Sequence, residues 1–186
     1  MKKIKKILAA NRSEIAIRIF RAAEESGIRT AAIYSKEDRF ALHRFKTDES
    51  YLVGEGKGPI QAYLDINSII DIAKKAGVDA IHPGYGFLSE NPEFADLCEK
   101  NNITFIGPTP EILSRLGNKT AAKDVADEAG VSTIPSVTVS EANKNNIHDQ
   151  VNKIGYPVIV KASWGGGGRG MRVVRSADEL SKQIEL

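Results

Sequence analysis

The segment from Ser163 to Met171 holds the residues that are best suited to chemistry, because four consecutive glycines, 165–168, are followed there by Arg169 and Gly170. Such a run loses much backbone entropy on folding, so it is expected where the backbone must move or press its amides against a ligand. A β-hairpin needs only two turn residues. The amides of this loop, with Arg169 beside them, can form an anion cradle suited to ATP phosphates. A flexible hairpin tip without a ligand is the alternative.

Two lysines could serve the same phosphates. Lys161 follows the apolar run 158–160, and a lysine at the end of a buried strand is unfavourable unless an anion meets it, which assigns Lys161 to phosphate. Gly117-Asn118-Lys119-Thr120 resembles the end of a P-loop, but Asn118 breaks the required spacing. Lys119 at a helix start either reaches a phosphate or has no special role.

The loop His82–Asn91 is a third candidate. Its two glycines, proline and aromatic residues make a stiff loop that can present Tyr85 and Glu90 to a ligand. A tight turn without a ligand would explain the proline and glycines but not the polar and aromatic residues. His82 by itself indicates hydrogen-bonded structure more than chemistry.

The turn Asn11-Arg12-Ser13-Glu14 follows the first predicted strand and lacks the Gly-x-Gly-x-x-Gly pattern, which disfavours nicotinamide and flavin dinucleotides. It allows two interpretations. Either Asn11 caps the next helix while Glu14 reaches back to it, or Arg12 or Glu14 lines a site at the carboxyl edge of a sheet.

These candidates lie at strand ends in a predicted α/β alternation. Apolar runs predict strands at 6–10, 29–34, 51–53, 80–82 and 103–106. Helices are predicted over 14–26 and 66–76, and from the starts Asn91-Pro92-Glu93 and Thr109-Pro110-Glu111. The pattern predicts a doubly wound parallel sheet, a Rossmann-like domain, over residues 1–115.

After Gly117 the pattern changes, and residues 116–186 are expected to be the truncated start of a second domain. A helix at 119–129, a β-rich segment at 135–139 and a polar stretch at 141–152 are predicted first. Strands at 157–162 and 172–174 then flank the glycine loop. Ser176 to Glu179 forms a capping box for a last helix.

Composition limits the class of protein. With 186 residues, 26 basic and 24 acidic side chains and a net charge of +2, the chain is expected to fold in water and to bind neither nucleic acid nor membrane. The lysines at 2, 3, 5 and 6 are interpreted as a solvated approach to the first strand. No apolar run could cross a bilayer, and with the single Cys98, expected to be buried and inert, this favours the cytoplasm. His43 and His148 are expected at the surface, and no histidines or cysteines have metal-site spacing.

A lysine-bearing strand, a glycine loop and a preceding α/β domain together resemble the ATP-grasp ligases. Within that superfamily the chain is similar to biotin carboxylases in the order and spacing of five segments. These are Ala10-Asn11-Arg12-Ser13-Glu14-Ile15-Ala16, His82–Asn91, Phe105-Ile106-Gly107-Pro108, Gly117-Asn118-Lys119 and Lys161–Arg172. One departure is Ser13, where the family more often has glycine.

The resemblance implies that the first domain is the pre-ATP-grasp domain and that the second begins the ATP-grasp domain. It implies that the two lysines contact ATP, that the glycine loop closes over its phosphates, that Met171 packs near the base, and that Tyr85 faces biotin and bicarbonate. The expected cofactor-binding residues are Lys119, Lys161, Ser163, Gly165, Gly166, Gly167, Gly168, Arg169, Gly170, Met171, Tyr85 and Glu90. No catalytic residue or metal ligand is assigned.

The segment 42–50 and Trp164 are most similar to the pyruvate carboxylase branch of the family, and the biotin carboxylase subunit of acetyl-CoA carboxylase is the alternative. The full enzyme is expected to use ATP, Mg²⁺ and biotin, to work with bicarbonate and a biotin carrier domain, and to form a homo-oligomer. The 186-residue chain alone is expected to be inactive. Another ATP-grasp ligase or a non-catalytic nucleotide-binding module would share much of this pattern.

Overall fold

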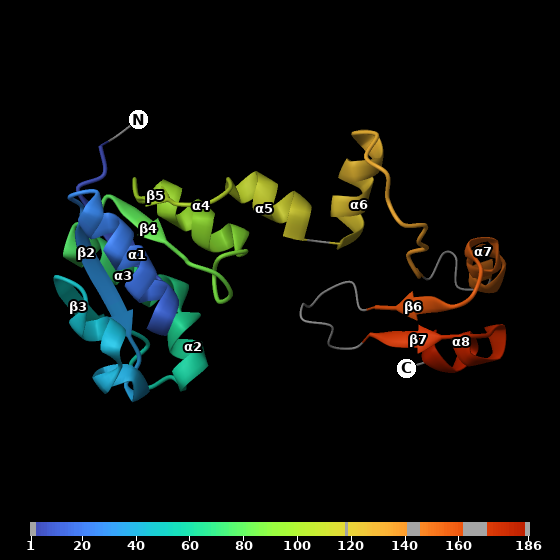
Figure 1. Ribbon diagram of the computed structural model, residues 1–186, viewed down its shortest axis with the longest axis horizontal. Helices are drawn as coiled ribbons and strands as arrows, with labels where there is room; N and C mark the ends of the chain where they lie inside the picture. The colour runs from blue at the N-terminus through green and yellow to red at the C-terminus, as the bar shows by residue number, and fades with distance from the viewer. Residues whose placement is uncertain (1–2, 118, 141–145, 162–170, 185–186) are drawn as a thin grey trace. The chain divides into compact units, whose positions relative to one another are not determined.

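The computed structural model describes residues 3–117, 119–140, 146–161 and 171–184. Two compact units make up the chain, Met1–Ser114 and Arg115–Leu186, and the division falls within helix α5 (Pro110–Gly117). Figure 1 gives the elements of each unit along the chain.

A five-stranded parallel sheet forms the centre of the first unit. Its strands are β1 (Lys6–Ala9), β2 (Arg29–Tyr34), β3 (Glu49–Leu52), β4 (Ala80–His82) and β5 (Thr104–Phe105). They lie in the order β3-β2-β1-β4-β5, with every neighbouring pair parallel. The order reverses at β1, and the prediction of a doubly wound parallel sheet is confirmed.

Helices cover both faces of this sheet. They are α1 (Ser13–Glu25), α2 (Pro59–Tyr63), α3 (Ile66–Ala76) and α4 (Pro92–Lys100), and two short 3-10 turns, η1 (Glu37–Phe40) and η2 (Leu42–Phe45), join β2 to β3. The predicted start of α4 is confirmed, because the Asn91 side chain accepts a hydrogen bond from the Phe94 amide at 2.8 Å. In the same way Asp65 caps α3 through the Ser68 amide. The sequence patterns did not predict α2, η1 or η2.

The alternation of β1 divides the core into two layers. Ile7 and Ala9 pack with the apolar side of α1, whereas Leu8 belongs to the cluster formed by α3 and α4. Alternate residues of a strand point to opposite faces of a sheet, so a strand that is apolar throughout can be buried on both. The first strand therefore lies at the centre of the unit.

Lys6 is a correction to the sequence interpretation. It is buried at the start of β1, and its Nζ donates to Glu49 Oε2 at 2.6 Å and to the Ala76 carbonyl at 2.7 Å. Hydrogen bonds from Lys6 and Tyr51 hold the pKa of the Glu49 carboxyl below its usual value. Lys3 and Lys5 are exposed, as expected, but Lys6 joins the amino ends of β1 and β3.

His43 is a second correction, because it is fully buried rather than at the surface. Its Nε2 lies 3.1 Å from the Ile33 carbonyl, and burial lowers the pKa of the ring. Cys98 is buried as predicted, and burial raises the pKa of its thiol to about 12, so the thiol is inert at neutral pH.

The second unit is described by itself. It contains α6 (Lys119–Glu128), α7 (Ile147–Ile154), the antiparallel pair β6 (Val158–Val160) and β7 (Arg172–Val174), and α8 (Ala177–Ile184). A small core joins the two later helices to the strands, with Ile147, Val151, Val174 and Leu180 buried. Helix α6 and both strands were predicted.

The structure contradicts or modifies three local predictions in this unit. Residues 135–139 form no strand, and α7 begins inside the stretch 141–152 that was interpreted only as polar and extends two residues beyond it. The capping box is present in altered form. Ser176 Oγ accepts from the Glu179 amide at 3.4 Å, but the Glu179 carboxylate accepts from the Arg175 amide rather than from that of Ser176.

Among the described residues, no helix combines the length and apolar character that a membrane crossing requires.

Gly54, which follows β3, is expected to tolerate no side chain. Its φ is +61°, and an added Cβ would lie 2.4 Å from the Ala62 Cα, whereas Gly56, at φ +80°, has open space around it. Both Gly→Ala changes introduce the left-handed penalty of about 1–2 kcal/mol. Gly54→Ala should add about 1–3 kcal/mol from the overlap. Urea unfolding followed by circular dichroism measures both, and equal midpoints would contradict the close approach.

Candidate functional site

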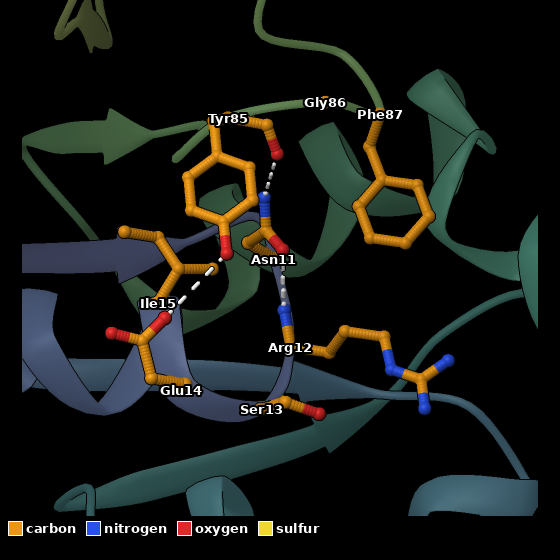
Figure 2. Close-up of a pocket in the computed structure, with 8 residues that line it drawn as sticks. All are labelled: Asn11, Arg12, Ser13, Glu14, Ile15, Tyr85, Gly86 and Phe87. Atoms are coloured by element: carbon orange, nitrogen blue, oxygen red, sulfur yellow. Dashed lines mark hydrogen bonds between the residues drawn. The ribbon is translucent and has the colours of Figure 1, made fainter. Parts of the chain in front are cut away.

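A pocket of about 380 Å³ lies where the carboxyl ends of β1 and β4 meet. The strand order reverses between these neighbours, and doubly wound sheets bind ligands at such a point. The pocket is formed by the turn after β1 and by the loop after β4, and Figure 2 shows its lining. The lining residues are Asn11, Arg12, Ser13, Glu14, Ile15, Tyr85, Gly86 and Phe87.

Asn11 ties the two sides of the pocket together. Its buried amide Nδ2 donates to the Pro83 carbonyl at 2.7 Å. It also donates to the Tyr85 carbonyl at 2.9 Å, the bond that Figure 2 shows. Its Oδ1 accepts from the Arg12 amide at 2.8 Å. The interpretation of Asn11 as a helix cap is wrong, because Arg12 is the capping residue of α1 and makes no side-chain cap. The carboxamide is used instead to hold the β4 loop.

Gly84 allows this contact. Its φ is +69°, and a Cβ at this position would lie 2.6 Å from the Asn11 Nδ2. The loop can therefore approach the β1 turn closely only because residue 84 has no side chain.

Ser13 begins α1 with φ +52°, a left-handed conformation that favours glycine. This conformation gives a physical reason for the glycine that the family resemblance leads us to expect at this position, and serine departs from it. The turn keeps its shape with serine at the expense of local backbone strain.

Glu14 and Tyr85 point toward each other across the pocket (Figure 2). The Tyr85 hydroxyl donates to Glu14 Oε2 at 3.5 Å, and Arg18 Nη1 lies 3.4 Å from Glu14 Oε1. Tyr85 is 66% exposed as a residue, so its ring can offer an apolar face beside a carboxylate. The interpretation in which Glu14 lines a site at the sheet edge is the one that this geometry supports.

Arg12 extends away from that pair (Figure 2). Its Nη2 lies 3.1 Å from Asp38 Oδ1, and its guanidinium lies 5.8 Å from the centre of the Tyr63 ring. The Tyr63 hydroxyl donates to Asp38 Oδ2 at 2.7 Å and accepts from the Ser35 amide at 3.2 Å. Sequence patterns gave no signal for Asp38 or Tyr63, because Asp38 lies in the four-residue turn η1 and Tyr63 ends the five-residue helix α2, and both elements are too short to show a periodic pattern.

The other residues predicted in the β4 loop lie outside the pocket. Glu90 is exposed and is absent from the lining. His82 is half-buried, its Nδ1 accepts from the Gly84 amide at 3.0 Å, and burial lowers its pKa. That hydrogen bond gives His82 the structural role that we expected.

In the second unit, Lys161 follows β6 and is exposed, so the expectation of a lysine at the end of a buried strand is wrong. Lys119 begins α6 as predicted. The predicted residues Ser163, Gly165, Gly166, Gly167, Gly168, Arg169 and Gly170 lie outside the described residues.

One face of the β6–β7 pair is apolar and exposed. Val158, Val160 and Val174 pack toward α7 and α8, and the alternation of the strands places Ile159 and Val173 on the opposite face as cross-strand partners. These two side chains are 54% and 51% exposed, and the neighbouring Met171 is 48% exposed. The second unit therefore presents an apolar platform with Lys161 beside its edge.

Residues 3–113, more than half of the chain, match the family model for the biotin carboxylase N-terminal domain. The chain belongs to the biotin carboxylase family. Residues 118–186 match the ATP-binding domain of the carbamoyl-phosphate synthase L chain. The predicted fold class is confirmed by both matches: an α/β biotin carboxylase N-terminal domain is followed by the start of an ATP-grasp domain.

Curated relatives in this family include pyruvate carboxylases. The chain is 57% identical over 182 residues to pyruvate carboxylase of Bacillus subtilis, covering 98% of this chain and 16% of the relative. It is 51% identical over 181 residues to the mitochondrial pyruvate carboxylase of Mus musculus, covering 97% of this chain and 15% of that protein. The chain thus spans about a sixth of the length of these carboxylases.

Solved structures of family members have the same fold. Rhizobium etli pyruvate carboxylase matches with a TM-score of 0.89 and 54% identity, covering 98% of this chain and 16% of that one. The biotin carboxylase domain of Hydrogenobacter thermophilus 2-oxoglutarate carboxylase matches with a TM-score of 0.92 and 44% identity, covering 100% of this chain and 40% of that one.

Replacement of Ser13 by glycine should stabilise the biotin carboxylase N-terminal unit. It removes the left-handed penalty of about 1–2 kcal/mol, which exceeds the extra backbone entropy of glycine, about 0.5–1 kcal/mol. A net gain of about 0.5–1 kcal/mol is expected from urea unfolding. Ser89, a loop serine outside the positive-φ region, is the matched control, and Ser89→Gly should lower stability. A loss of stability in Ser13→Gly would contradict the strain.

Proposed function

We propose that this chain is the N-terminal part of the biotin carboxylase component of a pyruvate carboxylase. The full enzyme would carboxylate biotin with ATP and bicarbonate and then transfer the carboxyl group to pyruvate, giving oxaloacetate. The relatives support the choice of acceptor, since identity is 57% to Bacillus subtilis pyruvate carboxylase and 47% to Biotin carboxylase 1 of the same organism.

The observation that carries the proposal is the apolar platform of Ile159, Met171 and Val173 with Lys161 at its edge. An adenine ring needs a flat apolar surface, and phosphates need cations and amides. The platform can take the base, and Lys161, Lys119 and the glycine loop can take the phosphates. The Hydrogenobacter thermophilus domain was solved with magnesium ADP, ADP and bicarbonate, which supports the same ligands here.

The pocket at the β1–β4 junction is proposed to face biotin and bicarbonate through Tyr85. Its exposed ring and the adjoining carboxylate of Glu14 suit a small ligand that has both an apolar face and polar edges. Glu90 belongs to the same loop after β4 but does not line the pocket, so it is given no contact with the ligand.

Phosphoryl transfer depends on positioning and charge stabilisation, so lysines and loop amides are the groups that this chain would supply. Mg²⁺, held with the nucleotide, would neutralise developing phosphate charge. Within the described ranges, no group of three or more His, Cys, Asp or Glu side chains could hold a metal ion, and the proposal assigns no metal ligand there.

The proposed partners of the full enzyme are a biotin carrier domain and further copies of the chain. The Hydrogenobacter thermophilus structure is described as a dimer of biotin carboxylase domains, which supports a homo-oligomer. A cytoplasmic location is also proposed, although the mouse relative is named as mitochondrial.

Lys161→Gln in the complete carboxylase should raise the KM for ATP about tenfold or more, because one charge-assisted hydrogen bond contributes about 1.5–3 kcal/mol. The matched control is Lys153→Gln, an exposed lysine of α7 in the same unit, which should leave the KM unchanged. Steady-state kinetics at varied ATP concentration measures the KM of each variant. An equal KM in the two variants would remove Lys161 from the nucleotide site.

The 186-residue chain alone should release no ADP in response to biotin and bicarbonate. Its described residues provide an open platform and no carboxylate cluster for Mg²⁺, whereas productive sites bury ~70–90% of a ligand. Binding can be measured separately through Trp164, the chain's single tryptophan, beside the glycine loop. ADP release comparable to that of the complete enzyme, and abolished by Lys161→Gln, would show that the chain holds a whole active site.

A further inference from the structure

Next to the β1–β4 pocket, a continuous series of polar contacts runs from the Ser35 backbone amide to the Arg12 side chain. The Ser35 amide donates to the Tyr63 hydroxyl, the hydroxyl donates to Asp38, and Asp38 pairs with Arg12. Tyr63 and Ser35 are fully buried and Asp38 is nearly so, whereas the Arg12 side chain remains 37% exposed at the pocket. The buried end is held inside the core, whereas Arg12, at the other end, is partly exposed and is one of the residues that line the pocket.

We propose that Asp38 and Tyr63 are positioning residues that fix the Arg12 guanidinium at the edge of the pocket. A planar guanidinium presents several N–H donors in a rigid fork, so the direction of that fork depends on the carboxylate that anchors it. Asp38 anchors one nitrogen, Nη2. This contact sets the direction of the other N–H donors of the Arg12 guanidinium. The Asp38 carboxylate is itself held by the hydrogen bond from the Tyr63 hydroxyl.

Tyr63 also supports the other wall of the pocket. Its ring stacks on that of Phe87, with centroids 5.2 Å apart and an interplanar angle of 23°. Phe87 lines the pocket and has φ +42°, a conformation that needs support from its surroundings. One buried tyrosine therefore contacts side chains from both loops that form the site.

A purely structural role is the alternative, and the chain contains a matched control for it. Tyr51 also donates its hydroxyl to a carboxylate, Glu49 Oε2, at 2.6 Å, but on the edge strand β3 and outside the pocket lining. Replacing either tyrosine by phenylalanine removes one hydroxyl and keeps the ring. Only the change at Tyr63 should act on Arg12.

The first test uses the 186-residue chain and does not depend on the proposed function. The side-chain N–H resonances of Arg12, followed by NMR, should show hindered rotation of the guanidinium in the unmodified chain. Tyr63→Phe should speed this rotation severalfold, and Tyr51→Phe should leave it unchanged. If Tyr63→Phe does not fold, Asp38→Asn, which keeps the shape and removes the charge, should give the same result. Unchanged rotation, or equal effects of the two tyrosine variants, would overturn the proposal.

The second test rests on the proposed function and uses the complete carboxylase with free biotin as the probe. Tyr63→Phe should lower kcat/KM for biotin about tenfold, because small misplacements of positioned groups have effects of this size or larger. In an Arg12→Gln background the same change should have no further effect, since residues that act through one group are not additive. Full additivity would overturn the proposal.

Together the two tests distinguish a failure of the proposed function from a failure of the positioning role of Tyr63 and Asp38. A complete protein without biotin-dependent activity would contradict the proposed function, and the NMR result would still decide the role of Tyr63. Faster Arg12 rotation with unchanged biotin kinetics would overturn the role of the network in the site.

Discussion

The carboxamide of Asn11 connects the two loops on which the first site depends. Strands β1 and β4 are neighbours in space but are separated by about seventy residues, so their loops need a direct connection to form one pocket. Asn11 supplies it by donating to two carbonyls of the β4 loop while its oxygen accepts from the Arg12 amide. Buried amide groups must be paired, so the same contacts that satisfy Asn11 also fix the shape of the site.

Charge pairs lie at both ends of the first unit's sheet. At the amino end, Lys6 bonds to Glu49 and so joins β1 to β3 across β2. At the carboxyl end, Arg12 pairs with Asp38 beside the pocket. Removal of one partner from a buried pair leaves an uncompensated charge, which is more destabilising than the pair is stabilising. Such pairs therefore specify the arrangement of the strand ends more than they add stability.

The second unit obtains its candidate site from strand alternation. Valines on one face of β6 and β7 form the core with α7 and α8, which leaves Ile159 and Val173 on the other face. An exposed apolar face of this kind on a small unit is a sign of a ligand or partner surface. The position of Lys161 directly after β6 adds a cation to it.

The sequence by itself determined the five strands of the first unit, the long helices between them, the doubly wound class and the loop that contains Tyr85, because these depend on periodicity and on local turn chemistry. The shorter elements α2, η1, η2 and α7 gave no such signal. It also located Cys98 in the core. It could not reveal that Asn11 binds a distant loop rather than capping a helix, nor that Lys6 and His43 are buried. Only the tertiary structure showed that Asp38 pairs with Arg12, that Tyr63 bonds to Asp38, and that Glu90 lies outside the pocket lining. The physical reason is that these contacts join segments far apart in the chain, and periodicity carries no information about such pairings.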